Sequence, residues 1–207
     1  MNKKKKIITE AAKTLFNEKG YSQVTIRMIA LKLEMSSGNL NYHYQKREDI
    51  FEALYFEMVA AFDERLAMLQ NVEVSIKQIR DDIEQSMLRM IDYKFFWTDL
   101  YNLLSVSDKV KKHFQEVYKN RIVGCLVLFE KLKKQELMRS ASFKLEYDLL
   151  AEQIVNYGNT WLYASNLYAK NNENIDKAAN TLLSFFYPYL TPKGQLEFKK
   201  EIPVFFD

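Results

Sequence analysis

The chain contains few of the residues that end helices and form tight turns, with only five glycines and three prolines among 207 residues. Folds with many strands need such residues at short intervals, so this composition argues against them and favours helices. A hydrophobic content of 48% is enough to build a sizeable core. We therefore expect an ordered, all-α protein.

Cysteine and long apolar runs are also scarce. The single cysteine, Cys125, cannot form an intramolecular disulfide, so nothing suggests an oxidising compartment, and it is expected to be a small core residue. The lysines at 3–6 resemble the start of a secretion signal, but only two isoleucines separate them from Thr9 and Glu10. No window approaches the roughly 18 apolar residues that a membrane span needs. The sequence predicts a soluble, cytoplasmic protein without membrane association.

The residues of common catalytic and metal sites are nearly absent. There are two histidines, His43 and His113, and neither has a neighbour at the spacing of a nucleophile or a metal ligand. No glycine-rich phosphate loop occurs. We expect no enzyme, no cofactor and no metal site, and we interpret His113 as a surface or boundary residue.

The small net charge of +3 is unevenly distributed. Residues 1–50 contain ten lysines or arginines and five acids, a charge of +5, whereas the remaining 157 residues contain 20 basic and 22 acidic side chains, a charge of −2. A basic N-terminal segment on a faintly acidic body indicates a polyanionic partner. The alternative is a solvated run of charges without a partner.

Apolar residues at helical spacing predict four helices in the first third of the chain, over residues 4–19, 25–33, 36–44 and 47–69. Gly20 can adopt the left-handed conformation that ends the first helix. Thr25 and Ser36 are suited to cap the second and third helices, with a turn at 33–35 between them. These elements predict a helix-turn-helix domain over residues 1–48.

The remainder, residues 49–207, is predicted to be a second helical domain. Further helices are expected over residues 74–93, 95–104, 109–134, 143–168 and 175–189, with Asp108, Ser142 and Asn174 as caps and with Pro188 and Pro192 ending the last helix. The tail from Thr191 is apolar for a chain end, and it is expected to dock either on the body or on a partner.

The third predicted helix carries polar and small residues where a packing helix would carry apolar ones. Donors and acceptors are provided by Ser36, Ser37, Asn39 and Asn41, and Gly38 would let the backbone come close to a partner. In a helix-turn-helix unit this helix lies in the major groove of DNA and its first residues meet base edges. Lys46 and Arg47 follow it and are suited to bind phosphate. The alternative is an ordinary exposed surface helix.

Residues 7–56 resemble the DNA-binding region of the tetracycline-repressor (TetR) family. The resemblance rests on A-A-K-T-L-F-N-E-K-G-Y at 11–21, V-T-I-R-M-I-A at 24–30, M-S-S-G-N-L-N-Y-H-Y at 35–44 and K-R-E-D-I at 46–50. Several spaced matches over about fifty residues are more specific than a single short pattern. The resemblance implies an N-terminal helix-turn-helix domain, followed by a helical domain that binds a ligand and dimerises.

The resemblance also implies the residues that contact DNA. These are Thr25, Ser37, Gly38, Asn39, Asn41, Tyr42 and Arg47, and the candidate DNA-binding set also includes Arg27, Ser36 and Lys46. Arg47 matches the lysine that usually opens the fourth helix in the family. Asn41 stands where the family usually has a tyrosine that touches the DNA backbone, and Tyr42 follows one place later. Met28 replaces the usual acid of the second helix, which we expect to weaken a cap.

By the same resemblance, the last two long helices pair two copies of the chain into a homodimer. The candidate interface residues are Leu150, Ile154, Gly158, Ser165, Ala179, Leu182 and Phe186. Gly158 would permit close approach of two backbones across a two-fold axis. A symmetric dimer presents two reading helices, so the expected partner is a double-stranded operator with an inverted repeat. The alternative is that these faces pack within one subunit.

Aromatic residues make up 14% of the chain, and many lie in the second domain. They are candidates to line a pocket for a small apolar or aromatic ligand: Phe96, Trp97, Tyr101, Tyr118, Phe129, Tyr157 and Trp161. Ordinary core packing explains each of them as well. The adjacent Phe95, Phe96 and Trp97 cannot share one helix face, so at least one of them should face elsewhere, for example a pocket or a partner.

Two functions follow from the sequence. The first is a DNA-binding transcriptional regulator, a ligand-responsive repressor that binds an inverted-repeat operator as a dimer. The second is a helical adaptor that binds a protein through its apolar tail and aromatic body, with a non-specific or vestigial DNA-binding head. Specific retention of an inverted repeat separates the first from the second.

Overall fold

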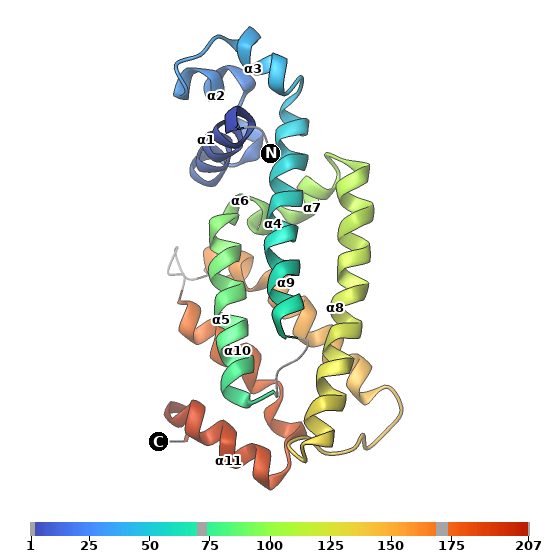
Figure 1. Ribbon diagram of the computed structural model, residues 1–207. Helices are drawn as coiled ribbons and strands as arrows, with labels where there is room; N and C mark the ends of the chain where they lie inside the picture. Colours follow the sequence, from blue (N-terminus) through green and yellow to red (C-terminus); the bar gives the residue numbers. More distant parts are fainter. Residues whose placement is uncertain (1–2, 70–73, 169–173, 207) are drawn as a thin grey trace. The chain divides into compact units, whose positions relative to one another are not determined.

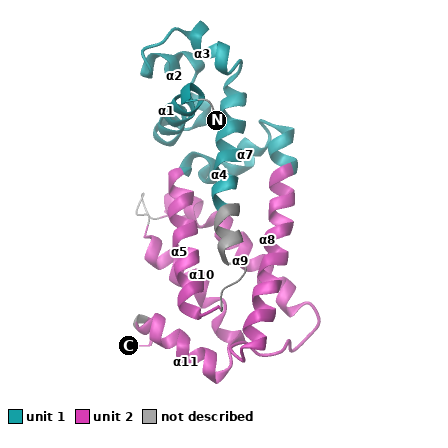
Figure 2. Ribbon diagram, viewed as in Figure 1, with its two compact units in different colours: residues 1–70, 93–112 teal, residues 71–92, 113–207 magenta. Residues whose placement is uncertain are grey.

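The computed structural model describes residues 3–69, 74–168 and 174–206, and these residues form helices joined by turns and by a longer loop over 135–145 (Figure 1). The described ranges contain no strand and only an isolated bridge between Met138 and Leu190. The predicted all-α class is confirmed. The chain forms two compact units, which are described separately: unit 1 comprises residues 1–70 and 93–112, and unit 2 comprises residues 71–92 and 113–207 (Figure 2).

The first four helices of unit 1 begin and end within two residues of the predicted positions. They are α1 (Lys3–Lys19), α2 (Ile26–Lys32), α3 (Ser37–His43) and α4 (Arg47–Leu69), with the short 3-10 helix η1 (Tyr21–Gln23) between α1 and α2. Gly20 follows α1 with φ +80°, a conformation that glycine adopts at little cost. Buried Ile8, Phe16 and Leu40 join the helices into one core. Local sequence patterns were sufficient to predict these elements.

Two short helices complete the core of unit 1: α6 (Lys94–Thr98) and α7 (Leu100–Leu104). They replace the single helix predicted over 95–104, because the backbone of Asp99 (φ −134°, ψ 29°) leaves the helical region. The ring of Phe95 lies 5.2 Å from that of Phe16 in α1. The ring of Phe96 lies 5.5 Å from that of Tyr55 in α4.

The three side chains of the Phe95–Trp97 segment are all buried and do face different neighbours, Phe95 the ring of Phe16 in α1 and Phe96 the rings of α4. The predicted domain boundary at residue 48/49 therefore lies inside a compact unit, which α4 and α6 share with the helix-turn-helix segment.

Unit 1 also contains the first turn of α8 (Asp108–Lys134). Its cap is Ser107, one residue before the predicted Asp108, and the Ser107 hydroxyl accepts a hydrogen bond from the N–H of Val110 at 3.2 Å. The same hydroxyl donates to Oε1 of Glu52 in α4 at 2.6 Å. These bonds tie the start of α8 to α4 within unit 1.

Unit 2 contains the rest of α8 together with α5 (Ile76–Asp92), α9 (Glu146–Tyr168), α10 (Ile175–Ser184) and α11 (Pro192–Glu201). Helix α10 packs along α5, and Arg80 of α5 links the two helices by donating to Oδ1 of Asn180 at 3.0 Å and pairing with Asp176. Asn174 caps α10 as predicted, since its Oδ1 accepts from the N–H of Lys177 at 2.8 Å.

Helix α11 is a helix that the sequence reasoning missed. Pro192 was expected to end a helix, whereas it occupies the first helical position after Thr191, where a missing N–H costs nothing. The predicted helix 175–189 instead ends at Ser184 and is followed by a 3-10 turn, η2 (Tyr187–Tyr189). Proline is compatible both with the first position of a helix and with the residues just after a helix ends. Only tertiary contacts decide which of the two roles Pro192 takes.

The apolar tail docks on its own unit. Phe198 and Ile202 are buried, and the ring of Phe206 lies 5.5 Å from that of Tyr187 and 6.2 Å from that of Phe198. Of the two expected destinations of the tail, the body is therefore the one observed. Leu196, Phe205 and Phe206 of the tail stay exposed, to 59%, 48% and 43%, so only part of its apolar surface is covered.

The loop between α8 and α9 is held by an ion pair. Arg139 donates to both carboxylate oxygens of Glu146, at 2.6 and 2.9 Å, and the backbone N–H of Ser142 donates to the same carboxylate at 2.6 Å. Helix α9 therefore starts at Glu146, and Ser142 does not cap it as predicted. The Arg139 hydrogen bonds, followed by that of Ser142, lower the pKa of Glu146 from 4.5 to about 2.

We expect Glu146→Gln to change how stability depends on pH. The ionised carboxylate stabilises the fold fully above pH 4.5, and this contribution disappears as the pH falls through about 2. The difference in free energy of unfolding between wild type and variant should therefore shrink over this range, as urea unfolding at a series of pH values would measure. Glu152→Gln, an exposed site on the same helix, is the control. A difference that stayed constant from pH 7 to pH 2.5 would contradict this role.

Candidate nucleic-acid interface

Two side-chain caps define the helix-turn-helix segment. Oγ1 of Thr25 accepts a hydrogen bond from the N–H of Met28 at 3.2 Å, and Oγ of Ser36 accepts one from the N–H of Asn39 at 3.1 Å. Between the two helices Glu34 adopts φ +52°, and the N–H of Met35 donates back to the carbonyl of Ala30 at 3.0 Å. The predicted caps and turn are confirmed, and Met28 contributes only its backbone to the cap.

Helix α3 presents its polar residues outward. Leu40 and Tyr44 are buried and hold the helix to unit 1, whereas Asn39, Asn41 and Tyr42 are exposed, Tyr42 to 86%. A Cβ at Gly38 would meet only Oγ of Ser36, at 4.0 Å, so internal packing does not require a glycine there. The small and polar surface of α3 is therefore free to approach another molecule.

Basic side chains accompany this surface. Arg27, Lys32 and Lys46 are exposed, as are Lys3, Lys4 and Lys6 at the start of α1, whereas Lys5 is half-buried. Lys5 lies over the ring of Tyr44 at 5.1 Å from the centroid, which ties the basic start of α1 to the end of α3. Charges of one sign placed around a polar reading helix suit a nucleic-acid backbone.

Arg47 is placed differently from the other predicted contacts. Its side chain turns inward, over the ring of Tyr21, and donates to backbone carbonyls of the segment between α1 and α2. The preceding residue, Lys46, donates its backbone N–H to Oδ2 of Asp49 at 2.9 Å. Of the two basic residues predicted to bind phosphate, only Lys46 has an exposed side chain.

Comparison with known families identifies this arrangement. The family of bacterial regulatory proteins called tetR matches residues 8–54. The bacterial transcriptional repressor family TetR matches residues 57–198, which is more than half of the chain. The chain belongs to the TetR family. It is thus a transcriptional regulator of the DNA-binding, repressor type, and the two matched segments meet between residues 54 and 57.

Individual proteins agree with this assignment. The chain is 30% identical over 120 residues to IcaR of Staphylococcus epidermidis, the negative transcriptional regulator of the biofilm operon icaADBC, and the match covers 55% of this chain and 62% of that protein. A TetR-family regulator from Marinobacter aquaeolei has the same fold, with TM-score 0.86, 21% identity and 98% of each chain covered. AibR, solved in complex with isovaleryl coenzyme A and operator DNA, has TM-score 0.68 and 16% identity, over 90% of this chain and all of that one.

The candidate ligand residues of this TetR-family protein do not form one cluster within either unit. In unit 1, Phe96 and Trp97 are core residues, and Tyr101 is 91% exposed. The other four candidates, Tyr118, Phe129, Tyr157 and Trp161, belong to unit 2.

Within unit 2 these four residues have different surroundings. Phe129 packs against the rings of Tyr147 and Phe186, at 5.4 and 5.8 Å. Nε1 of Trp161 donates to Sδ of Met90 at 3.2 Å, and the hydroxyl of Tyr118 reaches Oδ1 of Asn156 at 3.4 Å. The rings of Tyr157 and Phe185 pack edge to face, with their centroids 5.4 Å apart. Each of the four side chains therefore makes a ring contact or a hydrogen bond inside unit 2.

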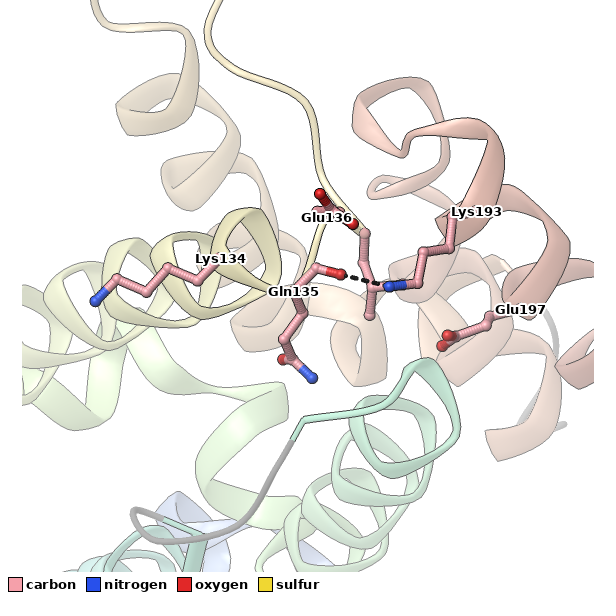
Figure 3. A pocket seen from close by; sticks show the side chains of 6 residues that line it. Lys134, Gln135, Glu136, Lys193 and Glu197 are labelled. Carbon is pink, nitrogen blue, oxygen red and sulfur yellow. Dashed lines mark hydrogen bonds between the residues drawn. The ribbon is translucent and has the colours of Figure 1, made fainter.

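Two surface hollows lie elsewhere. One, between the end of α8 and α11, is lined by Lys134, Gln135, Glu136, Leu137, Lys193 and Glu197, and in Figure 3 Lys193 donates across it to the carbonyl of Gln135, at 2.9 Å. The other lies beside α1 and is lined by Lys3, Lys6, Ile7, Glu10, Ala11, Thr14 and Leu33. Neither hollow contains a candidate ligand residue. Among the described residues, no three His, Cys, Asp or Glu side chains gather as metal ligands, and no helix is long and apolar enough to cross a bilayer.

The candidate dimer residues pack mainly inside unit 2. Leu150, Ile154, Ala179, Leu182 and Phe186 are buried in the single chain, and Gly158 and Ser165 are half-buried. This matches the alternative in which the faces pack within one subunit.

A different face of α9 is exposed. Its members are Leu149, Gln153, Asn156, Thr160, Tyr163 and Leu167, which recur at alternating intervals of four and three residues. An average interval of 3.5 residues is typical of a helix that pairs with another helix. Sequence reasoning missed this set, although its spacing is visible in the printed chain.

Helix α8 has a matching exposed surface. Residues 122–129, I-V-G-C-L-V-L-F, contain no polar side chain and so surround the helix with apolar groups. Val123 and Val127 are 57% and 53% exposed. Helix α8 is joined to α9 by Nη1 of Arg121, which donates to Oδ1 of Asn159 at 2.8 Å. We call the exposed residues Val123, Gly124 and Val127 of α8, with the six of α9, the α8–α9 face.

Proposed function

We propose that this protein is a repressor that binds an inverted-repeat operator as a homodimer and releases it on binding a small apolar or aromatic ligand. The observation that carries the proposal is the outward polar surface of α3, capped by Ser36 and surrounded by exposed basic residues. Asn39 and Asn41 are suited to bond base edges, and Thr25, Arg27, Ser36 and Lys46 to bond phosphates. Ser37, Gly38 and Tyr42 would lie along the groove. The cytoplasm, where the operator is accessible, is the proposed location.

The homodimer is proposed to form through the α8–α9 face. A helix segment that is apolar all round, as residues 122–129 of α8 are, is normally buried, and burying its Val123 and Val127 against a second copy, with Tyr163 of α9 beside them, would satisfy this requirement. Gly124 supports the proposal, since a Cβ there would meet nothing within 4 Å in the protomer. A mid-helix glycine without an internal packing role is suited to close approach by a partner helix.

Ligand control is proposed as a population shift. In one conformation of the dimer the two copies of α3 have the wrong separation for the operator. A ligand that binds this conformation more tightly lowers operator affinity, at most by the ratio of its affinities for the two conformations. AibR, which has the same fold, was solved in complex with isovaleryl coenzyme A and operator DNA. This supports the proposal that one chain of this fold binds both a small ligand and DNA. In unit 2 the candidate ligand residues are Tyr118, Phe129, Tyr157 and Trp161, and in unit 1 they are Phe96, Trp97 and Tyr101. The negative regulator IcaR supports repression as the outcome.

Asn39→Ala tests the reading role of α3. We expect affinity for a duplex selected from a random pool to fall by about 1–3 kcal/mol and discrimination at one base position per half-site to relax. Competition binding against duplexes substituted at each position measures this. Asn102→Ala, an exposed asparagine on α7, is the matched control. Equal loss of affinity for every duplex would contradict base reading by Asn39.

A further inference from the structure

Arg47, the first residue of α4, makes contacts that differ from those of a phosphate-binding side chain. Its Nη1 donates to the backbone carbonyls of Val24 at 2.9 Å, Tyr21 at 3.1 Å and Ser22 at 3.4 Å. The guanidinium carbon lies 4.1 Å from the centroid of the Tyr21 ring. Nη2 lies 3.7 Å from Oε1 of Glu48, and the side chain is only 26% exposed. The guanidinium is thus occupied on one face and along one edge.

The three carbonyls belong to the segment that leads into α2. Tyr21 and Ser22 lie in η1, and the carbonyl of Tyr21 also accepts the N–H of Val24 at 3.2 Å. Val24 immediately precedes Thr25, the residue whose hydroxyl caps α2. Arg47 therefore holds the backbone of Val24, the residue just before the cap of α2.

The ring of Tyr21 anchors the same segment from the other side. It is buried, lies 5.1 Å from the ring of Phe16 in α1 and 5.4 Å from that of Phe51 in α4. Its hydroxyl is 3.3 Å from Oε1 of Glu48. Arg47, Tyr21 and Glu48 together join the first turn of α4 to the entrance of α2.

We propose that Arg47 is a positioning residue for DNA recognition, which fixes the entrance of α2 against α4 and does not itself bind phosphate. The inference rests on the proposed function, because it concerns how that DNA surface is held. Planar stacking with simultaneous donation to several carbonyls is a property of guanidinium that lysine does not share. To bind a phosphate through Nη1, Arg47 would have to give up the carbonyls that order α2. Phosphate binding near this point falls to the exposed Lys46.

The test compares Arg47→Met with Lys46→Met, which removes a positive charge from the adjacent residue. Methionine keeps the apolar stem over Tyr21 and removes the donors. The probes are a duplex selected from a random pool and a scrambled duplex of the same length, titrated over a series of salt concentrations. We expect Arg47→Met to weaken binding of the selected duplex about tenfold, with unchanged salt dependence and unchanged binding of the scrambled duplex.

Lys46→Met should behave in the opposite way. It should weaken both duplexes alike and reduce the slope of log affinity against log salt by about 0.9 for each phosphate that the side chain no longer neutralises. Arg47→Lys keeps the charge but removes the guanidinium group that lies over the Tyr21 ring and donates to the carbonyls. We expect it to bind the selected duplex more weakly than wild type, whereas a phosphate-binding role would survive this substitution.

A second measurement does not depend on DNA. In the free protein, the amide of Met28, which donates to Thr25, should exchange its hydrogen faster in Arg47→Met than in Lys46→Met, at equal global stability. Three results would overturn the inference: a reduced salt slope in Arg47→Met, wild-type affinity in Arg47→Lys, or unchanged exchange at Met28. If the wild-type protein preferred no duplex, the proposed function would fail, while the exchange rates would still decide whether Arg47 holds the entrance of α2.

Discussion

Replacing Val123 and Val127 together by glutamate is expected to convert the proposed homodimer to a monomer and to lower operator affinity about 10²–10⁴-fold. Both side chains are exposed in the protomer, so the substitutions leave its core intact. In the dimer they would place four carboxylates in an apolar interface, where desolvation and repulsion oppose association. Each monomer could then hold only one half-site, and the gain from binding two linked sites would disappear.

Sedimentation and titration of a selected duplex measure the two parts of this result. Leu196→Glu is the matched control, because Leu196 is also exposed and apolar, and it lies in unit 2 on α11, outside the α8–α9 face. The control should remain a dimer with wild-type affinity. A double variant that stayed dimeric and kept its operator affinity would show that the α8–α9 face is not the interface.

Phe96→Ala is expected to lower the free energy of unfolding by about 3–5 kcal/mol. Phe96 is 1% exposed, and its ring contacts Tyr55 at 5.5 Å, Trp97 at 5.2 Å and Phe51 at 6.3 Å. Alanine would leave a cavity among aromatic rings that cannot all move to fill it. Since whole domains are stable by only about 5–15 kcal/mol, unit 1 would lose much of its stability and the protein much of its DNA binding.

Denaturant unfolding measures this loss. Tyr101→Ala on the neighbouring α7 is the control, because that side chain is almost fully exposed and its removal should change stability by less than about 0.5 kcal/mol. The pair also separates two interpretations of Phe96. If Phe96 lined an open ligand site, its truncation would cost little stability. A decrease below about 1 kcal/mol would therefore contradict its role in the core.

Elements fixed by neighbouring residues were predictable from the sequence. Thr25, Ser36 and Asn174 each cap a helix through an N–H three residues later, so both partners lie within one short stretch of chain. The turn at Glu34 and the end of α1 at Gly20 also depend on local conformation. These features were sufficient to predict the helix-turn-helix, and the family was identified from the matches at 11–21, 24–30, 35–44 and 46–50.

Features that depend on distant contacts were not predictable in the same way. Arg47 looked like a phosphate-binding residue because its partners, the carbonyls near Tyr21, are 23 to 26 positions away. Apolar periodicity located the long helices α8 and α9 but did not say which apolar face meets the protomer core. Leu150 and Ile154 of α9 belong to the core, whereas the α9 residues of the α8–α9 face, such as Leu149 and Leu167, are exposed. Pro192 ends a helix or starts one according to the packing around it.

Selection of duplexes from a random pool by the wild-type protein, followed by titration of the selected and scrambled sequences, tests operator recognition directly. We expect the selected duplexes to share an inverted repeat with half-site centres about 34–36 Å apart, and the repeat to bind at least about 10³-fold tighter than scrambled DNA. Selected duplexes without a shared motif, bound no more tightly than scrambled DNA and only through salt-sensitive contacts, would contradict sequence-specific repression by this protein.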